Sequence, residues 1–428
     1  MVRTSRQLTA LAAPIAGVQF AQVALTTTDL ALMGLIGVQA IAAGGLAAAL
    51  YNLMRTMCVG VVTAVGNLVA GAAGRGETRS GSTLPDDQAQ AEIRQITRSA
   101  VLVATAAAVL LGVALIGLGY VLPLIGLDKE VVGLARPMMI ALAPGLIPMV
   151  WLNVLRQFSV GMRRPGPLLA VSIASIALNA ALDLLFIYGL VGIPKLGLAG
   201  IGLATTLVQV ITVAAFYVIL RRDDHLAPLL SIDGLKADAP TARSIVRLGI
   251  PISLTYGSEA GITSLAAVVM GAFGPIALAA HNVVTQLTRI AFQVSIGLSH
   301  GASILISRAI GRADPKHAQQ VATAAIVLGW LTTAVIGLVY VGAPSIVLRP
   351  FLSPSDSSTM VLAKLFLLFA IVQQIVDFTQ NIAVGSAGSE ILPPGCAPPR
   401  SGIGWWDCRR CCCSPSRRTC RARECGSA

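Results

Sequence analysis

The sequence predicts an all-α membrane protein with many spanning helices, and three observations carry this prediction. Of its 428 residues, 55% are hydrophobic and only 12% are charged, whereas soluble domains average about 25% charged residues. The mean hydropathy is +0.78, so the chain has too few polar groups to cover a surface that faces water. Aromatic residues make up only 5% of the chain, which argues against a transmembrane barrel with aromatic girdles.

Ten apolar segments are long enough to cross a bilayer, because a spanning helix needs roughly 20 mainly apolar residues. They are expected at 9–35, 41–73, 99–124, 133–155, 167–189, 196–220, 246–272, 277–307, 320–344 and 360–386. The first segment is too long for the core of a signal peptide, and no small-residue cleavage site follows it. We therefore expect it to remain as a helix.

Lysine and arginine residues are distributed unequally between the two sides of these segments. One side carries seventeen: Arg3, Arg6, Arg75, Arg79, Arg94, Arg98, Arg156, Arg163, Arg164, Arg221, Arg222, Lys236, Arg243, Arg247, Arg308, Arg312 and Lys316. The other side carries five: Lys129, Arg136, Lys195, Arg349 and Lys364. The excess predicts that the N-terminus is cytoplasmic. It also accounts for the net charge of +12 without a nucleic-acid partner.

An internal repeat relates the two parts of the chain at a fixed offset of 237 residues. The matched pairs are Pro14 with Pro251, Gly34 with Gly271, Gly37 with Gly274, Gly60 with Gly297, Gly74 with Gly311, Arg75 with Arg312 and Glu77 with Asp314. Identities at one offset argue against chance similarity between glycine-rich helices. The repeat unit holds six spans, an even number, so both halves enter the membrane in the same direction. Such halves imply a pseudo-two-fold axis along the membrane normal, with a cavity between them.

The second half has only four predicted spans, so we expect a truncated second lobe. We divide the chain into an N-lobe at 1–222, a cytoplasmic linker at 223–245, a C-lobe at 246–388 and an atypical tail at 389–428. Seven of the eight cysteines lie at or after residue 396. One interpretation of the tail is a zinc knuckle built from Cys408, Cys411, Cys420 and Cys425. The favoured interpretation is out-of-frame translation that replaced two helices, since the tail begins where the repeat predicts another span.

Four of the nineteen acidic residues fall inside predicted spans, and these are the candidate site residues: Asp29, Asp183, Glu259 and Asp377. An ionisable group inside a bilayer costs about 2.5–3.5 kcal/mol on insertion scales and marks an ion or proton site by default. The alternative is a structural ion pair with Arg55 or Arg289. The acids outnumber those two partners, so the functional interpretation is favoured.

Neighbouring oxygen-bearing residues extend the candidate site. Asp29 follows Thr26, Thr27 and Thr28, and Thr205 could add another hydroxyl. Asn179 and Asp183 are four residues apart and therefore share one face of a helix. Carboxylate, amide and hydroxyl oxygens suit a hard cation such as Na⁺. The same carboxylates can instead take a proton, because an apolar cavity disfavours their charged form.

Other motifs contribute little to function. His281 and His300 are interpreted as packed, structural histidines, and Cys58 stands alone in the body of the chain. The sequence has no phosphate-binding loop of the ATPase type. We therefore expect no enzyme activity, no catalytic residues, no metal centre and no cofactor beyond a coupling ion, Na⁺ or H⁺.

Four segments together resemble the multidrug and toxic compound extrusion (MATE) family, specifically its NorM-like branch. TTTDLALMGLIG is similar to the family's first-helix Asp motif, and residues 155–205 to its signature from helix four to helix six. Residues 247–283 resemble its seventh helix with Glu259, and QQIVDFTQNIAVGSAG its tenth helix with Asp377. The resemblance covers about residues 1–388. The family pattern has two further helices after residue 388, where this chain has its cysteine-rich tail.

The resemblance implies twelve helices in two lobes that open alternately to each side. It implies antiport of Na⁺ or H⁺ against organic, often cationic, drug-like compounds by a monomer in the cell inner (plasma) membrane. Asp29, Asn179, Asp183 and Thr205 match the family's N-lobe cation site, and Glu259 and Asp377 match its C-lobe acids. Two alternatives are a flippase for a lipid-linked sugar, which should have a more cationic central cavity, and an inactive truncated product.

Overall fold

The computed structural model describes residues 2–36, 38–81, 85–125, 129–164, 166–189, 194–231, 233–273, 275–348 and 357–387. Every regular element in these ranges is a helix. Side chains in parts of several helices, including those of Thr26 and Thr27, are outside the description. The predicted tail, with its candidate zinc ligands, also lies outside the described residues.

The first half of the chain folds into eight α-helices. They are α1 (Val2–Ile36), α2 (Val38–Val62), α3 (Val65–Ser80), α4 (Asp87–Val121), α5 (Lys129–Leu142), α6 (Leu146–Gly161), α7 (Gly166–Tyr188) and α8 (Leu198–Arg221). Two 3₁₀ turns, η1 (Leu122–Ile125) and η2 (Ala143–Gly145), follow α4 and α5. The second predicted span corresponds to α2 plus α3, and the fourth to α5 plus α6.

The second half begins after a linker that contains the short turns η4 (Ala227–Leu229) and η5 (Gly234–Lys236). Its helices are α9 (Ala239–Ala272), α10 (Pro275–Gly311), α11 (Pro315–Gly342), α12 (Pro344–Leu348) and α13 (Ser357–Ala387). Pro315 is tolerated in the first turn of α11 because a backbone N–H at that position would have no acceptor within the helix, so the N–H that proline lacks is not missed. Asp314 caps the same turn by accepting a hydrogen bond from the backbone N–H of His317 at 3.0 Å.

The membrane prediction is confirmed by the helices. Eight helical segments among the described residues are long and apolar enough to cross a membrane. The two other predicted spans coincide with α1 and α9, which have 35 and 34 residues and include residues outside the description. Each of the ten predicted spans therefore overlaps a helical segment, four of them in the second half.

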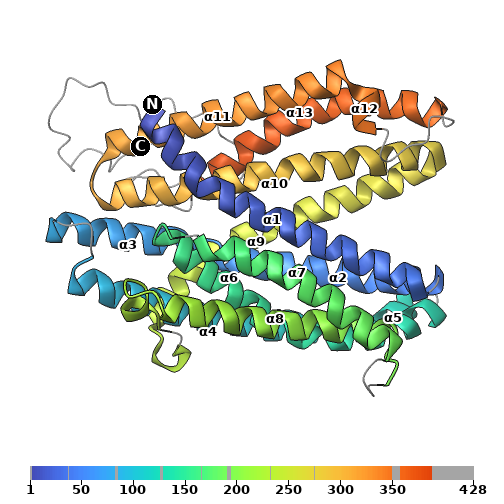
Figure 1. The fold of residues 1–428 in the computed structure, drawn as a ribbon, viewed down its shortest axis with the longest axis horizontal. Helices are drawn as coiled ribbons and strands as arrows, with labels where there is room; N and C mark the ends of the chain where they lie inside the picture. The colour runs from blue at the N-terminus through green and yellow to red at the C-terminus, as the bar shows by residue number, and fades with distance from the viewer. Residues whose placement is uncertain are drawn as a thin grey trace, which may run out of the picture. The chain divides into compact units, whose positions relative to one another are not determined.

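Helices from the two halves interlock along one interface. In Figure 1, α1 runs obliquely across the view, and it contacts α7 of its own half and α10 of the other. The other pairs across the interface are α2 with α9 and α3 with α10. One hydrophobic cluster fills the first half and extends into α10 and α11, whereas a smaller one is confined to α10, α11, α12 and α13.

Glycines at the interface make equivalent contacts in the two halves, as the pseudo-two-fold axis predicted from the repeat requires. A Cβ on Gly60 would collide with Ser253 of α9, and a Cβ on its repeat mate Gly297 would collide with Ala16 of α1. Residues 16 and 253 are themselves 237 apart, so the two contacts are equivalent. In the same way Gly74 lies against the carbonyl of Arg308, and Gly311 against that of Gly71. A two-fold axis produces such pairs, because each contact between the halves occurs twice with the roles of the two halves exchanged. The contacts therefore agree with two halves of the same fold related by the repeat.

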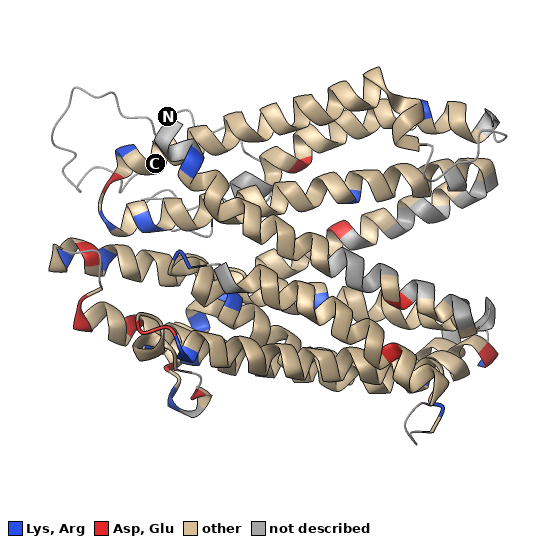
Figure 2. Ribbon diagram, in the orientation of Figure 1, with Lys and Arg blue, Asp and Glu red and all other residues tan. Residues whose placement is uncertain are grey.

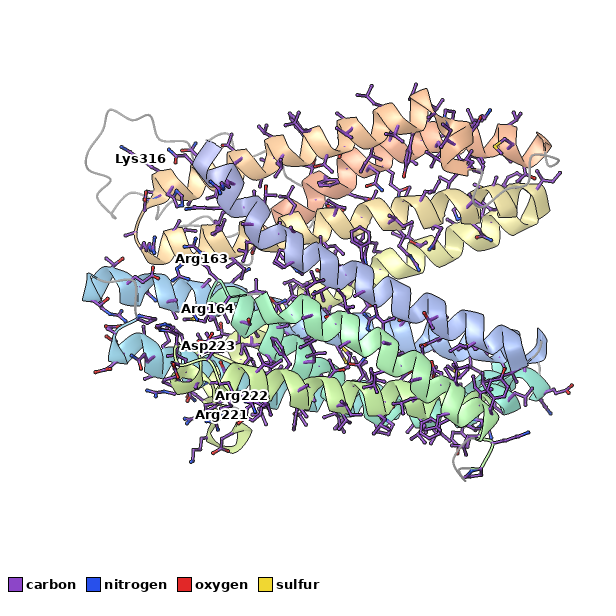
Figure 3. All side chains as sticks on the ribbon, in the orientation of Figure 1. Arg163, Arg164, Arg221, Arg222, Asp223 and Lys316 are labelled. Carbon is purple, nitrogen blue, oxygen red and sulfur yellow. The ribbon has the colours of Figure 1, made fainter. Side chains whose placement is uncertain are left out.

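Basic residues gather at one end of the helices, which we call the basic end. The end of α3, the end of α8 and the turn from α10 to α11 mark this end (Figure 1), and Figure 2 shows its concentration of Lys and Arg. Arg163, Arg164, Arg221, Arg222 and Lys316 all lie there in Figure 3. Arg164 is ion-paired with Asp223 at 2.8 Å, which joins the α6–α7 turn to the end of α8.

The linker is held against α4 of the first half. Arg94 donates to the carbonyl of Pro228 at 3.3 Å, and Arg98 donates to the hydroxyl of Ser231 at 2.7 Å. Gln95 donates to the carbonyl of Lys236 at 3.3 Å. These bonds give the basic residues at the start of α4 a structural role.

Candidate functional site

Asp29, Asn179 and Asp183 form one polar cluster inside the first half. Asn179 and Asp183 lie one turn apart on α7 and are fully buried. Asp29 reaches the cluster from α1, which packs against α7. The carboxamide nitrogen of Asn179 donates to Asp29 Oδ1 at 2.5 Å and to Asp183 Oδ2 at 2.8 Å. One amide group therefore bridges two carboxylates from different helices.

The cluster has more oxygen atoms than donors. Among the described residues, Asn179 Oδ1 and Asp183 Oδ1 are buried without a hydrogen-bond partner. A buried polar atom left unpaired costs about 1–3 kcal/mol. Two neighbouring carboxylates also repel each other unless a cation or a proton compensates their charge. The arrangement is therefore suited to hold one positive charge against carboxylate and amide oxygens.

Thr205 of α8 belongs to the same neighbourhood. It is buried, and its hydroxyl donates to the carbonyl of Ile201 at 3.0 Å, as buried threonines in helices commonly do. Its side chain also lies within interaction distance of Asp29. The structure thus brings together four predicted site residues of the first half, Asp29, Asn179, Asp183 and Thr205.

Glu259 of α9 and Asp377 of α13 form a second acidic pair, in the other half of the chain. Their carboxylates are close enough for their charges to interact. Gln373, one turn before Asp377, hydrogen-bonds to the Asp377 carboxylate. Both acids are partly buried. The six predicted site residues therefore form two groups, one in each half.

One basic residue of the first half, Arg156 of α6, is buried and makes a contact that the sequence analysis did not predict. Its guanidinium group donates to the side chain of Gln19 of α1 at 2.9 Å. Its charge interacts with those of Arg55 and His300. Arg55 donates to Asn52 at 3.2 Å.

A buried ion pair joins the two halves at the basic end, and it was also missed by the sequence. Glu77, at the end of α3, accepts hydrogen bonds from Arg308 and Arg312, at the end of α10. Glu77 and Arg308 are 6% and 8% exposed. The repeat matches Glu77 to Asp314, but a match between equivalent positions does not reveal that Glu77 pairs across the interface.

Comparison with known proteins decides the family. The sequence model of the MatE family matches residues 14–185 and 251–389, which is most of the described chain. The chain belongs to the MatE family. The resemblance stated from the sequence is therefore confirmed. The MatE match leaves out residues 186–250, which include α8 and the linker, and it ends at residue 389.

Relatives and solved structures agree with membership of the MatE family. The chain is 34% identical to a probable multidrug resistance protein NorM of Pseudomonas aeruginosa, over 88% of this chain and 75% of that protein. It is 33% identical to a protein of the same name from Bradyrhizobium diazoefficiens, over 92% of this chain and 83% of that one. A mutant of the Vibrio cholerae MATE transporter VcmN shares the fold, with a TM-score of 0.76, 17% identity and coverage of 91% and 85%.

Proposed function

We propose that this chain exports small organic compounds, often cationic ones, by exchanging them for Na⁺ or H⁺ across the cell inner membrane. The observation that carries the proposal is the cluster of Asp29, Asn179 and Asp183, in which two buried oxygens have no hydrogen-bond partner among the described residues. The names of the NorM relatives describe probable multidrug resistance proteins, which supports drug-like substrates.

The way in which the halves meet supports a mechanism of alternating access. With the N-terminus in the cytoplasm, the basic end faces inward. Four hydrogen bonds that join the halves lie between mid-helix and this end, from Ser253 with Met57 to Glu77 with Arg308. The structure therefore supports a state that is sealed toward the cytoplasm. Export requires a second state in which these contacts open.

The coupling ion is expected to act through the first-half cluster. A cation or a proton there neutralises the Asp29 and Asp183 carboxylates and favours the arrangement of α1, α7 and α8 that binds it best. Organic substrate favours the opposite arrangement, so the two compete through one conformational cycle. Each charge that moves with the membrane potential supplies about 2.3 kcal/mol per 100 mV.

The test is transport by purified full-length protein in liposomes. An imposed Na⁺ gradient or an imposed pH gradient drives the efflux of a fluorescent organic cation, and the rate of efflux is measured. The proteins compared are wild type, Asp29→Asn and Asp183→Asn. We expect both variants to lose about 90% or more of gradient-driven efflux. Asp224→Asn, an exposed neutralisation in the linker, is the matched control and should transport normally. Full coupled efflux by both site variants would refute the assignment.

A second candidate function is the flipping of a lipid-linked sugar. The observation in its favour is the buried Arg156, whose charge interacts with those of the half-buried Arg55 and His300, because a phosphorylated lipid carrier needs cations inside the protein. The same liposomes can be loaded with a fluorescent polyprenyl-phosphate sugar. Flipping that depends on Arg156, with no movement of the organic cation, would favour this function over drug export.

A further inference from the structure

A cavity at the basic end lies between the two halves, away from both acidic groups. Its volume is about 320 Å³. The polar side chains that line it are Gln7, Arg163, Arg308, Arg312, Asp314 and His317. Gln7 and Arg163 belong to the first half, from α1 and the α6–α7 turn. The other four come from the end of α10 and the start of α11.

Arg308 has an unsatisfied donor in this region. Its Nε and Nη2 atoms donate to Glu77. Its Nη1 atom is buried and has no hydrogen-bond partner among the described residues. The residue as a whole is only 8% exposed. A buried charged donor without an acceptor is costly. Arg308 lines the cavity, so a rotation of its guanidinium group would bring this donor to an acceptor held there.

The cavity is also rich in positive charge. Three guanidinium groups converge on it, and the nearby Glu77 carboxylate is already bound by Arg308 and Arg312. The Asp314 carboxylate caps α11 through the backbone N–H of His317. Burial lowers the pKa of Arg163, and repulsion from Arg308 and Arg312 lowers it further, against the opposing effect of Glu77. The cavity therefore carries a local excess of positive potential.

The α6–α7 turn fixes Arg163 at the edge of the cavity. Arg163 has a φ of 61°, a left-handed conformation that non-glycine residues adopt only at a cost. The backbone N–H groups of Arg163 and Arg164 donate to Val160 at 2.8 Å and Ser159 at 2.9 Å. The next residue, Arg164, pairs with Asp223 instead. Two adjacent arginines thus serve different partners, and only Arg163 lines the cavity.

We propose that this cavity binds a phosphate-bearing anion, held by Arg163 from one half and by Arg308 and Arg312 from the other. Planar guanidinium forks match the oxygen pairs of phosphate groups. The volume is about ten times the share of one water molecule in the liquid, so it admits a phosphate with its substituents. Basic pockets between helices on the cytoplasmic side suit lipid headgroups, and free phosphate has the same chemistry. An anion that touches both halves stabilises the state in which they meet.

The first arm of the test uses inorganic phosphate. The thermal unfolding midpoint of purified full-length protein in neutral detergent is followed against phosphate concentration, with sodium chloride at equal ionic strength as reference. Wild type, Arg163→Gln and Arg164→Gln are compared, because the two variants remove the same charge from adjacent positions. We expect saturable stabilisation of wild type and Arg164→Gln, with an apparent Kd about tenfold weaker for Arg163→Gln.

The second arm uses a lipid headgroup. The same three proteins are titrated with mixed micelles of phosphatidylglycerol or of phosphatidylcholine, and retained phospholipid is measured by native mass spectrometry. Stabilisation by inorganic phosphate identifies a free-phosphate site. An effect of phosphatidylglycerol alone, lost in Arg163→Gln, identifies a headgroup site. Equal responses of the two variants in both arms, or no response beyond that to chloride, would overturn the proposal. Neither arm measures transport, so the result is independent of the proposed function.

Discussion

At the scale of single residues, Asn179 organises the first-half site. Its amide nitrogen donates to both the Asp29 and the Asp183 carboxylate, and its own Oδ1 atom is buried without a partner among the described residues. An aspartate there would add a third negative charge, and an apolar residue would remove the bridge. An amide supplies both a donor for the acids and an acceptor for an ion.

The role of Asn179 gives the first prediction. Asn179→Ala should weaken binding of the coupling ion about tenfold or more, because it removes one oxygen ligand and the donor that positions two others. Ser175→Ala, one turn earlier on α7, removes only a local bond to the carbonyl of Ser172 and should bind the ion normally. Binding is measured by calorimetry of purified protein, titrated with Na⁺ or with acid. Equal affinities for the two variants would contradict the bridging role.

Part of the site could be predicted from sequence, and the limit has a physical cause. Asn179 and Asp183 share a face because the helical period places them there. The distances from Asp29 and Thr205 to that face depend on how α1 and α8 pack, which no local pattern encodes, so only the family resemblance grouped these two residues with Asn179 and Asp183. Charge counting along the sequence could not reveal the bond from Arg156 to Gln19, because the two residues are 137 positions apart.

At the scale of elements, the crossing of α3 and α10 depends on glycine. Gly74→Ala would place a methyl group against the backbone carbonyl of Arg308, which cannot move aside as a side chain can. We expect a loss of about 1–3 kcal/mol, typical of overpacking. Gly117→Ala, in α4, meets no atom within 4 Å and should be neutral or slightly stabilising. Thermal unfolding of both variants in detergent checks this, and equal midpoints would contradict it.

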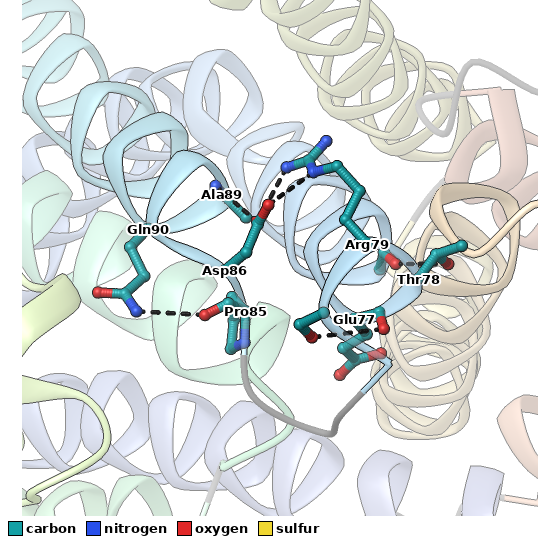
Figure 4. Close-up of polar contacts among 9 residues, drawn as sticks. Glu77, Thr78, Arg79, Pro85, Asp86, Ala89 and Gln90 are labelled. Atoms are coloured by element: carbon teal, nitrogen blue, oxygen red, sulfur yellow. Dashed lines mark hydrogen bonds and ion pairs between the residues drawn. The ribbon is translucent and has the colours of Figure 1, made fainter.

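The start of α4 gives a prediction about pH. Figure 4 shows Asp86 accepting from Arg79 and from the backbone N–H of Ala89, at 2.7 and 3.0 Å. The hydrogen bond from Arg79 lowers the pKa of Asp86, and the bond from Ala89 adds to this effect. A lowered pKa in the folded state means that the stabilisation is present above the unfolded value of about 3.9 and is lost as pH falls through the folded value.

We therefore expect acid to loosen the first turn of α4. Hydrogen exchange of amides in 87–92, corrected for the intrinsic pH dependence of exchange, should speed up as Asp86 is protonated. Asp86→Ala should show fast exchange at every pH, because the cap is missing throughout. Asp87→Ala, at the next position, should keep the pH dependence of wild type. A pH profile unchanged by Asp86→Ala would show that another group titrates.

At the scale of the whole molecule, one asymmetric ion pair is built on a symmetric interface. The equivalent contacts of Gly60 and Gly297, and of Gly74 and Gly311, let the halves approach closely on both sides of the axis. The charges do not follow this symmetry, because Glu77 binds both Arg308 and Arg312 while its repeat mate Asp314 caps α11. The repeat could predict the symmetric contacts from sequence, but not which of two equivalent acids closes the interface.

That asymmetry makes Glu77 the residue whose loss should open the basic end. Glu77→Gln leaves Arg308 buried without its counter-charge, which typically costs 3–5 kcal/mol. This cost falls only on the state in which α3 and α10 meet, so the equilibrium should move toward the state open to the cytoplasm.

Glu92→Gln is the matched control, because Glu92 pairs with Arg75 inside the first half and its side chain is 39% exposed. An exposed pair contributes only about 0–1 kcal/mol. Hydrogen exchange in 65–80 and 300–311 should increase in Glu77→Gln alone. An equal increase in both variants would mean that the ion pair across the interface does not hold the basic end closed.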